Sequence, residues 1–273
     1  MKIVVPMAGT GDRFVQKGYT DPKPLIKVQD KTIISRIVEM FSPEDKFVFI
    51  CNDQHLATTN IKNAILELVP TATILSMPCH KKGPVYTASV AFDHIADDEP
   101  VIISYCDNPF VWDYQDFQKT MKQTAADGCI LTHTGFHPHT LNNTKMAFLK
   151  TDGMVVKEIK EKSCYTDNPM SEHASTGAYY FRTGKMVKDY FQKAMDQNVS
   201  YKGEFYVTLV YNLLIADNLF VTYYDAPFVT VLGTPEEVQS FEAWQTILGS
   251  GQVKTHDDLI KCFEYWKEYN NAV

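Results

Sequence analysis

The chain has 273 residues, of which 45% are hydrophobic and 22% charged, the usual balance of a globular protein with a buried core. Its formal net charge of −7, without any run of Lys and Arg, argues against a nucleic-acid partner. Its apolar runs are shorter than the roughly 18 residues that span a bilayer, which argues against a membrane partner.

Six scattered cysteines without a Cys-x-x-Cys pair predict reduced thiols rather than a disulfide scaffold or a zinc ribbon. The N-terminus passes from Met1-Lys2 directly into an apolar run, with no secretory h-region. We therefore expect a cytoplasmic protein. An acidic chain that handles anionic substrates must concentrate its few cations locally, so the positions of single Lys and Arg residues are informative.

Strands and helices alternate through the first half of the chain. β-Branched and apolar runs predict strands at Lys2–Pro6, Lys46–Cys51, Thr73–Met77, Pro100–Tyr105 and Gly128–Gly135. Apolar residues at helical spacing predict helices at Lys31–Phe41, His55–Val69 and Pro84–Ile95. This alternation indicates an α/β fold, Rossmann-like, with a mostly parallel mixed sheet flanked by helices. Ligands bind such sheets at the carboxyl ends of the strands, where the Gly9 loop and Asp107 both fall.

The second half is less regular. The turn sequence Asp152-Gly153 predicts a hairpin of Lys145–Lys150 and Val155–Lys162. Further strands are predicted at Ala174–Phe181, Leu219–Tyr224 and Phe228–Leu232. Further helices are predicted at Gly184–Gln197, Glu204–Ala216, Pro235–Leu248 and His256–Tyr269. Without a linker or an internal repeat, residues 1–273 are predicted to form one domain.

The segment from Pro6 to Phe14 carries the clearest chemical pattern. A strand leads into Ala8-Gly9-Thr10-Gly11, whose backbone N–H groups can approach a polyphosphate closely. Arg13 and Lys23 add two cations. A Walker loop would end in Gly-Lys-Ser/Thr, and a dinucleotide fingerprint would place glycine where Phe14 stands. A tight turn would explain the glycines, but it would not explain the cations.

The stretch from Met7 to Ile26 resembles the signature of the sugar-phosphate nucleotidyltransferases. It is close to the branch found in surface-polysaccharide gene clusters, with Met-Ala-Gly-x-Gly-x-Arg-Phe and then Gly-Tyr-x-x-Pro-Lys-Pro-Leu-Ile. The resemblance extends across most of the chain and implies a glycosyltransferase-A-like α/β fold. It also implies an enzyme that joins a nucleoside triphosphate to a sugar 1-phosphate or similar acceptor, releasing pyrophosphate. About 1–135 would then be the nucleotide-binding half, and about 136–273 the acceptor-binding half with the C-terminal helices.

On the donor side, the resemblance implies that four loop residues hold the nucleotide and two cations hold its triphosphate; they are Ala8, Gly9, Thr10 and Gly11, with Arg13 and Lys23. Gly83 is a candidate base contact, although a loop that starts a helix would explain it equally well.

Asp107 matches a metal-binding acid. A carboxylate directly after an apolar strand needs a compensating cation or hydrogen bonds, and Mg²⁺ on nucleotide phosphates would supply it. The alternative for Asp107 is a helix N-cap.

On the acceptor side, Glu161 and Lys162 match a Glu-Lys pair that precedes the family's Thr-Gly-x-Tyr motif, here containing Gly177. The resemblance implies that Glu161 holds sugar hydroxyls and Lys162 the acceptor phosphate. Glu204 resembles a further acceptor-side acid. The alternatives are a solvated strand edge for the first pair and a favourable helix-start acid for Glu204. Arg13, Lys23, Asp107 and Lys162 would form the catalytic set.

One position departs from the family pattern. Many members carry a second metal-binding Asp two residues before the Gly of a Gly-Thr segment, and here Val231 stands at that position. Either one carboxylate suffices, or Asp225 or Glu204 substitutes, or catalysis is lost. The last case would leave a nucleotide-sugar-binding protein without turnover. A sugar-nucleotide-dependent glycosyltransferase is a further alternative, although its usual Asp-x-Asp is absent at Asp107-Asn108-Pro109.

Two other patterns are interpreted as structural. His133, His137 and His139 fit no zinc spacing, and we expect a polar loop there. Cys106 has no adjacent base in the sequence, so we expect a buried packing thiol rather than a nucleophile. The sequence leaves open the nucleobase, the acceptor and whether the chain forms a homo-oligomer.

Overall fold

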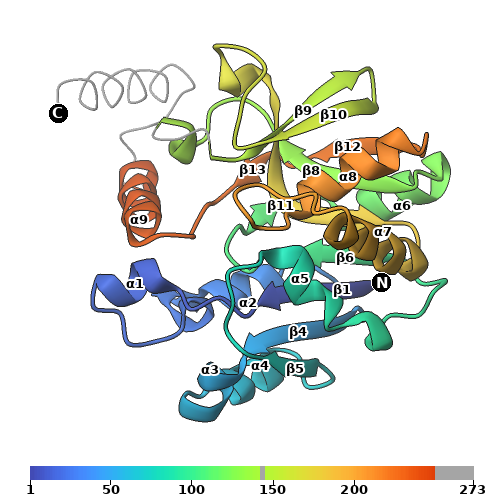
Figure 1. Ribbon diagram of the computed structural model, residues 1–273. Helices are drawn as coiled ribbons and strands as arrows, with labels where there is room; N and C mark the ends of the chain where they lie inside the picture. The colour runs from blue at the N-terminus through green and yellow to red at the C-terminus, as the bar shows by residue number, and fades with distance from the viewer. Residues whose placement is uncertain (142–144, 250–273) are drawn as a thin grey trace.

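The computed structural model describes residues 1–141 and 145–249 (Figure 1). Within these ranges the main sheet contains β1 (Lys2–Met7), β4 (Lys46–Asn52), β5 (Thr73–Met77), β6 (Val101–Ser104), β8 (Gly128–His133), β9 (Ala147–Asp152), β10 (Val155–Glu161), β11 (His173–Phe181) and β12 (Val221–Asp225). Two small ladders pair β2 (Lys27–Val28) with β3 (Lys31–Thr32) and β7 (Phe110–Val111) with β13 (Phe228–Val229). The helices are α1 (Asp12–Gln16), α2 (Ile33–Val38), α3 (Asp53–Thr58), α4 (Ile61–Leu68), α5 (Pro84–Ser89), α6 (Tyr114–Thr124), α7 (Gly184–Asp196), α8 (Val207–Ala216) and α9 (Pro235–Gly249).

The main sheet is mixed, with the order β5-β4-β1-β6-β11-β8-β12-β10-β9. Strands β5, β4, β1 and β6 are parallel, whereas β11 runs antiparallel to both of its neighbours, β6 and β8. The carboxyl ends of β1 and β6 lie on the side of the sheet where α1 and α9 are found, at the left of Figure 1. Loops from both halves of the chain meet at that edge, which is where this class of sheet binds ligands.

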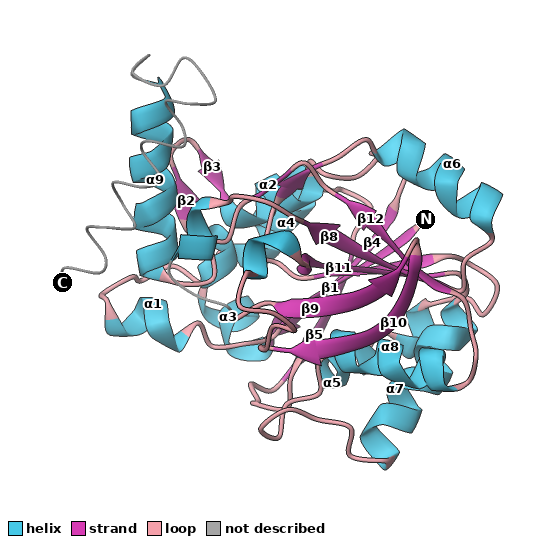
Figure 2. Cartoon of the chain, turned by 90° about the horizontal axis from the view of Figure 1, so that it is seen from above, coloured by secondary structure: helices cyan, strands magenta, loops and turns pink. Residues whose placement is uncertain are grey.

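Alternating side chains of β1 belong to two hydrophobic layers on opposite faces of the sheet. Ile3 and Val5 pack with residues of α2, α4 and α6, and Val4 packs with residues of α5, α7 and α8. Figure 2 shows the sheet between these two groups of helices. The alternation follows from the two-residue period of a strand, and burial on both faces explains why β1 reads as a continuous apolar run.

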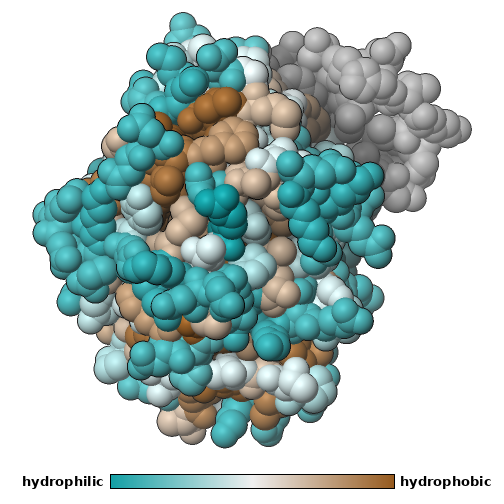
Figure 3. Space-filling view, turned by 90° about the vertical axis from the view of Figure 1, so that its right-hand side faces the viewer, coloured by the Kyte–Doolittle hydropathy of each residue, from teal (hydrophilic) through white to brown (hydrophobic). Residues whose placement is uncertain are grey.

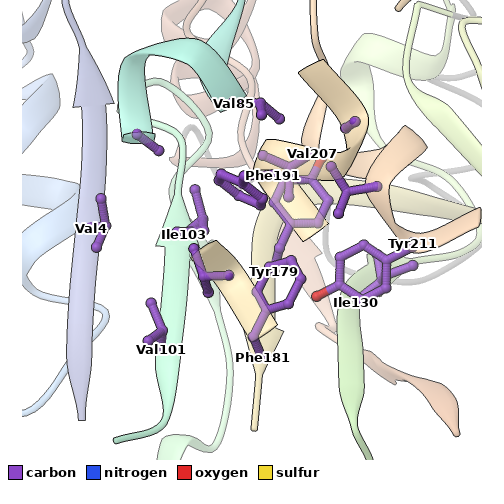
Figure 4. Close-up of a cluster of buried hydrophobic side chains, with 14 of the residues drawn as sticks. Val4, Val85, Val101, Ile103, Ile130, Tyr179, Phe181, Phe191, Val207 and Tyr211 are labelled. Carbon is purple, nitrogen blue, oxygen red and sulfur yellow. The ribbon is translucent and has the colours of Figure 1, made fainter. Parts of the chain in front are cut away.

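Helix α8 is anchored firmly to the sheet. Figure 4 shows Val207 and Tyr211 of α8 beside Tyr179 and Ile130 of the strands. The Tyr211 hydroxyl donates to the carbonyl of Tyr180 at 2.6 Å, so this buried polar atom is satisfied. Because α8 is fixed in this way, the extended segment just before it is held at the edge of the sheet.

A smaller hydrophobic cluster supports the glycine loop. It joins α1 to the first residues of α9 and contains Phe14, Ile26, Val28, Ile33, Leu232 and Val238. Phe14 is only 1% exposed, and burial of a Phe side chain contributes about 1.5–3 kcal/mol. The five-residue helix α1 is therefore held by packing, and its neighbour Arg13 is presented at a fixed place.

The predicted α/β fold with a mixed sheet and flanking helices is confirmed. Several element boundaries were wrong. The helix predicted at His55–Val69 is two helices, since the side chains of Thr58 and Thr59 hydrogen-bond to carbonyls of the preceding turn and α3 ends there. The helix predicted at Pro84–Ile95 stops at Ser89 and continues only as a 3₁₀ turn at Phe92–His94.

In the second half, the helix predicted from Glu204 begins at Val207, and the strand predicted at Phe228–Leu232 ends at Val229. In both places the chain belongs neither to a helix nor to a strand ladder of a named sheet. Helix α6 was not predicted, because only Phe117 and Met121 of its residues are buried and most of its other residues are polar. The helix predicted at His256–Tyr269 lies outside the described residues.

No helix in the described part of the chain is both long and apolar enough to cross a membrane. The face of the molecule in Figure 3 is largely hydrophilic, with hydrophobic areas scattered between polar side chains. This distribution is ordinary for a protein surface exposed to water.

Candidate active site

A cleft of about 370 Å³ opens at the carboxyl ends of β1 and β6. This volume lies within the usual range for small-molecule sites. Both halves of the chain contribute to its walls. The lining residues are Pro6, Met7, Ala8, Gly9, Thr10, Gly11, Asp12, Arg13, Phe14, Lys23, Pro24, His80, Lys81, Gly83, Pro84, Thr87, Tyr105, Cys106, Asp107, Glu204, Tyr206 and Gly233.

The glycine loop forms one wall of the cleft. Gly11 has a left-handed backbone (φ +69°), and its carbonyl accepts hydrogen bonds from the N–H groups of Phe14 and Val15 at 2.8 and 3.2 Å. A Cβ atom on Gly11 would lie 3.5 Å from the Cβ of Lys23, so the loop packs directly against that lysine. Arg13 is exposed at the cleft and forms no ion pair within the described ranges, which leaves its charge available to a ligand.

Lys23 and Asp107 form an ion pair at the floor of the cleft. The Nζ atom of Lys23 lies 2.7 Å from Oδ2 of Asp107, and each side chain is 22% exposed. Burial alone would lower the pKa of Lys23, but attraction to Asp107 outweighs this effect and the pKa lies above its usual value. Lys23 is therefore a cation at neutral pH and can contact an anionic ligand.

A second carboxylate approaches Asp107 across Gly233. A Cβ atom on Gly233 would lie 3.1 Å from Oδ2 of Asp107 and 3.2 Å from Oε2 of Glu237. The N–H of Leu232 donates to the carbonyl of Asp107 at 2.8 Å, which fixes this approach. Burial and the Asp107 charge raise the pKa of Glu237, and Arg13 opposes the rise. The sequence did not single out Glu237, because it falls within the helix predicted at Pro235–Leu248.

Five residues between 80 and 87 form another wall of the cleft. Gly83 has φ +86°, and a Cβ atom there would lie 2.7 Å from both the N and O atoms of Phe205. The N–H of Phe205 donates to the carbonyl of Lys82 at 2.9 Å, and the N–H of Val85 donates to the carbonyl of Phe205 at 3.1 Å. Glycine is therefore required at position 83 by both its backbone angle and this close approach.

His80 stabilises the same wall as a neutral imidazole. The N–H of Lys82 donates to Nδ1 of His80 at 3.0 Å. The Thr87 hydroxyl donates to the carbonyl of Gly83 at 3.2 Å, so its oxygen can accept the Nε2 proton of His80 at 3.1 Å. These partners assign the proton to Nε2. Burial and the charge of Lys82 lower the pKa of His80, which favours this neutral form.

Of the residues expected to bind the acceptor, one lines the cleft and three lie behind its lining. Among the described residues, Glu204 lines the cleft, whereas Glu161, Lys162 and Gly177 do not. The ammonium of Lys162 donates to the hydroxyl of Tyr206 at 2.5 Å, and that hydroxyl donates to Oε2 of Glu204 at 3.0 Å. Tyr206 itself lines the cleft, so it stands between Lys162 and any ligand.

Glu161 and Gly177 have clear structural partners. The Thr208 hydroxyl donates to Oε2 of Glu161 at 2.6 Å, and burial raises the pKa of this carboxyl. Gly177 (φ +90°) accepts a hydrogen bond from the N–H of Tyr105 at 2.9 Å. A Cβ atom on Gly177 would lie 3.1 Å from Cδ2 of Tyr105. Gly177 therefore shapes the wall of the cleft through Tyr105.

Asp225, one of the two residues suggested to compensate for Val231, is occupied elsewhere. Its Oδ1 accepts hydrogen bonds from the Thr132 hydroxyl at 2.6 Å and from Nδ1 of His173 at 3.0 Å. It is absent from the lining of the cleft within the described chain. The carboxylate that faces Asp107 across Gly233 is Glu237, and the structure does not bring Asp225 to that place.

His133, His137 and His139 are buried rather than forming the polar loop we expected. Nε2 of His139 lies 3.1 Å from Nε2 of His133, and burial lowers the pKa of His139 to about 3. The described residues contain no group of three or more His, Cys, Asp or Glu side chains arranged to hold a metal.

Cys106 is buried and its pKa is raised to about 11 by burial, as expected of a packing thiol.

Comparisons with known proteins show the family and the fold of the chain. Residues 3–154 match the MobA-like NTP transferase domain, and a search of curated proteins found no match. The fold is similar to a nucleoside-diphosphate-sugar pyrophosphorylase from Vibrio cholerae RC9 (TM-score 0.70, 21% identity, covering 88% of this chain and 99% of that one). It is also similar to a UDP-glucose pyrophosphorylase complexed with UDP-glucose (TM-score 0.68, 16% identity, covering 90% of this chain and 98% of that one). A third similar structure is the inositol-1-phosphate CTP transferase from T. maritima (TM-score 0.64, 12% identity, covering 89% of this chain and 96% of that one).

Proposed function

The chain belongs to the MobA-like NTP transferase domain family and is a nucleotidyltransferase; from this premise we propose that it joins a nucleoside triphosphate to a sugar 1-phosphate or a similar phosphorylated small molecule. The observation that carries the proposal is the single cleft that combines the glycine loop and the Lys23–Asp107 pair with Glu204 and Tyr206. The similar structures, which include pyrophosphorylases for sugar nucleotides, support this choice of acceptor.

In the proposed reaction, an oxygen of the acceptor phosphate attacks the α-phosphorus of the triphosphate. A new P–O bond forms, the bond between the α-phosphorus and the bridging oxygen breaks, and pyrophosphate leaves with that electron pair. The chain's contribution is positioning and charge neutralisation. Ala8 to Gly11 and Gly83 would hold the nucleotide, while Arg13 and Lys23 would offset the charge of the leaving pyrophosphate.

Mg²⁺ fits the carboxylates at this end of the cleft. Asp107 and Glu237 would hold the ion, because both present hard oxygen ligands to the space beside Gly233. Two protein carboxylates match the usual Mg²⁺ site, in which phosphates and water complete the coordination. When bound, the ion would neutralise charge on the nucleotide phosphates. Glu237 would then supply the carboxylate that Val231 does not.

Two features of the proposal concern cellular context. The residues from Met7 to Ile26 support placement in the surface-polysaccharide branch. The free cysteines Cys51, Cys79, Cys106 and Cys129 support action in the reducing cytoplasm. Formation of a homo-oligomer stays a prediction, which light scattering of the purified protein would test.

The decisive experiment is a pyrophosphate-release assay. CTP, UTP, dTTP, GTP and ATP would each be combined with a panel of sugar 1-phosphates and other phosphorylated alcohols, with and without Mg²⁺. We expect release with one triphosphate and one acceptor, dependent on Mg²⁺. Nucleotide binding without turnover for any acceptor would instead favour a binding protein. Turnover only with a sugar nucleotide as donor would favour a glycosyltransferase.

A further inference from the structure

Tyr206 occupies the point where the acceptor side of the cleft meets Lys162. Its hydroxyl accepts a hydrogen bond from the Lys162 ammonium and donates its only proton to Glu204. The Nζ atom of Lys162 also lies 4.3 Å from the centroid of the Tyr206 ring, a cation–π distance. The tyrosine therefore holds the ammonium by both its hydroxyl and its ring.

The backbone fixes Tyr206 in this place. The preceding residue, Phe205, shares two hydrogen bonds with the Lys82–Val85 segment, and the following residue, Val207, begins the buried helix α8. Burial and the Glu204 charge raise the pKa of Tyr206, so the phenol keeps its proton at neutral pH. A held ammonium and a protonated phenol together offer hydrogen-bond donors to an anion in the cleft.

We propose that Tyr206 is the acceptor-phosphate-binding residue of this cleft and the residue that positions Lys162. The proposal rests on the proposed function. When an acceptor phosphate enters, the Tyr206 hydroxyl turns its proton from Glu204 to a phosphate oxygen, and the adjacent Lys162 ammonium neutralises the phosphate charge. Glu204, no longer occupied by Tyr206, accepts hydrogen bonds from hydroxyl groups of the acceptor. The site thus selects a molecule with a phosphate at one end and hydroxyl donors beside it.

The test compares Tyr206→Phe with Tyr201→Phe. The Tyr201 ring is also near Lys162, with Nζ 5.3 Å from its centroid, but the hydrogen bond of Lys162 goes to Tyr206. The probes are glucose 1-phosphate and inorganic phosphate, with dissociation constants measured by ³¹P NMR titration. Loss of a hydrogen bond to a charged group costs about 1.5–3 kcal/mol, so we expect Tyr206→Phe to weaken both probes about tenfold or more. We expect Tyr201→Phe to stay within about twofold of the parent protein, because it keeps the ring and the Tyr206 bond.

A double-mutant cycle then tests whether Tyr206 acts with Lys162. Tyr206→Phe combined with Lys162→Met is expected to be little weaker than Lys162→Met alone, since the two residues bind as one unit. Additive losses would overturn the positioning role, and unchanged probe binding in Tyr206→Phe would overturn the whole inference. The thermal shift produced by a nucleoside triphosphate serves as the reference. If the parent protein shows this thermal shift but binds neither probe, only the inference on Tyr206 is contradicted. If the parent protein shows no thermal shift and binds neither probe, the proposed function is contradicted.

Discussion

The ammonium of Lys23 lies 2.7 Å from the carboxylate of Asp107, although the two residues are 84 positions apart in the chain. The pair joins the 3₁₀ turn that begins at Lys23, between α1 and β2, to the loop after β6. A positive and a negative group are thus available side by side, the first for a phosphate oxygen and the second for a cation. Their closeness follows from β1 and β6 being adjacent parallel strands.

Replacement of Lys23 by Ala should lower the rate of pyrophosphate release at least about a hundredfold with the fold intact, because charge-stabilising groups commonly supply that much. Circular dichroism would verify the fold. Lys27→Ala is the matched control, since Lys27 is an exposed lysine of the same region that does not line the cleft. Near-normal turnover by a folded Lys23→Ala protein would remove Lys23 from the mechanism.

Replacement of Glu237 by Gln should weaken binding of Mn²⁺, used as a spectroscopic substitute for Mg²⁺, about tenfold or more in the presence of nucleotide. Glutamine keeps the helix start intact, since the N–H of residue 237 bonds to Oγ1 of Thr234 and Gln is equally suited to this capping position. The variant therefore removes the charge without removing the cap. Electron paramagnetic resonance of free Mn²⁺ would give the dissociation constant.

Glu236→Gln provides the control for that measurement. Glu236 is the neighbouring residue on α9, but it is exposed and pairs with Lys17 at 3.1 Å. We expect its Mn²⁺ affinity to match that of the parent protein. Equal Mn²⁺ affinities for both variants would show that Glu237 is only a capping residue.

Replacement of Gly83 by Ala should lower both the melting temperature and the affinity for nucleotide. A backbone with φ +86° and ψ 175° costs about 1–3 kcal/mol for a residue with a Cβ atom, and the new methyl group would also collide with the backbone of Phe205. Gly18→Ala separates the two effects, because Gly18 has φ +85° with no atom near its Cβ position. Calorimetry should show the larger loss for Gly83→Ala. Equal losses would mean that the contact with Phe205 relaxes freely.

Nucleotide affinity should fall at acid pH through His80. Its pKa lies below the ordinary value of 6.5, so the stabilisation from its neutral form is fully present above pH 6.5 and is lost as the pH falls through the lowered pKa. Protonation would place a second proton on Nδ1, where the N–H of Lys82 already donates. Dissociation constants for the triphosphate measured from about pH 5 to about pH 8 should show this loss, and His80→Gln should reduce it. A pH profile unchanged in His80→Gln would assign the effect to the nucleotide or to other histidines.

The donor side of the cleft was largely predictable from the sequence. The glycine loop and Lys23 are close in the chain, and Asp107 follows a strand whose parallel neighbour leads into that loop. Strand alternation alone therefore predicts that they share an edge. The structure places them there, while their roles in catalysis stay predictions.

The acceptor side was less predictable, because its arrangement depends on chain that departs from regular periodicity. Glu204 was assigned to a helix, yet the helix begins only at Val207, and both Glu204 and Tyr206 line the cleft. Glu237 reaches Asp107 because β13 ends at Val229, where the sequence pattern predicted three more strand residues. Hydrophobic periodicity carries little information about where such irregular segments lie.

The contact between Gly83 and Phe205 has a consequence for engineering the enzyme. The wall formed by residues 80–85 and the segment that carries Glu204 and Tyr206 share two backbone hydrogen bonds and have no space between them. A loop transplanted from a relative to alter base preference would therefore displace the acceptor-side residues as well. Chimeras should retain activity only when residues 80–85 and 203–206 are exchanged together, because the two segments pack as one unit.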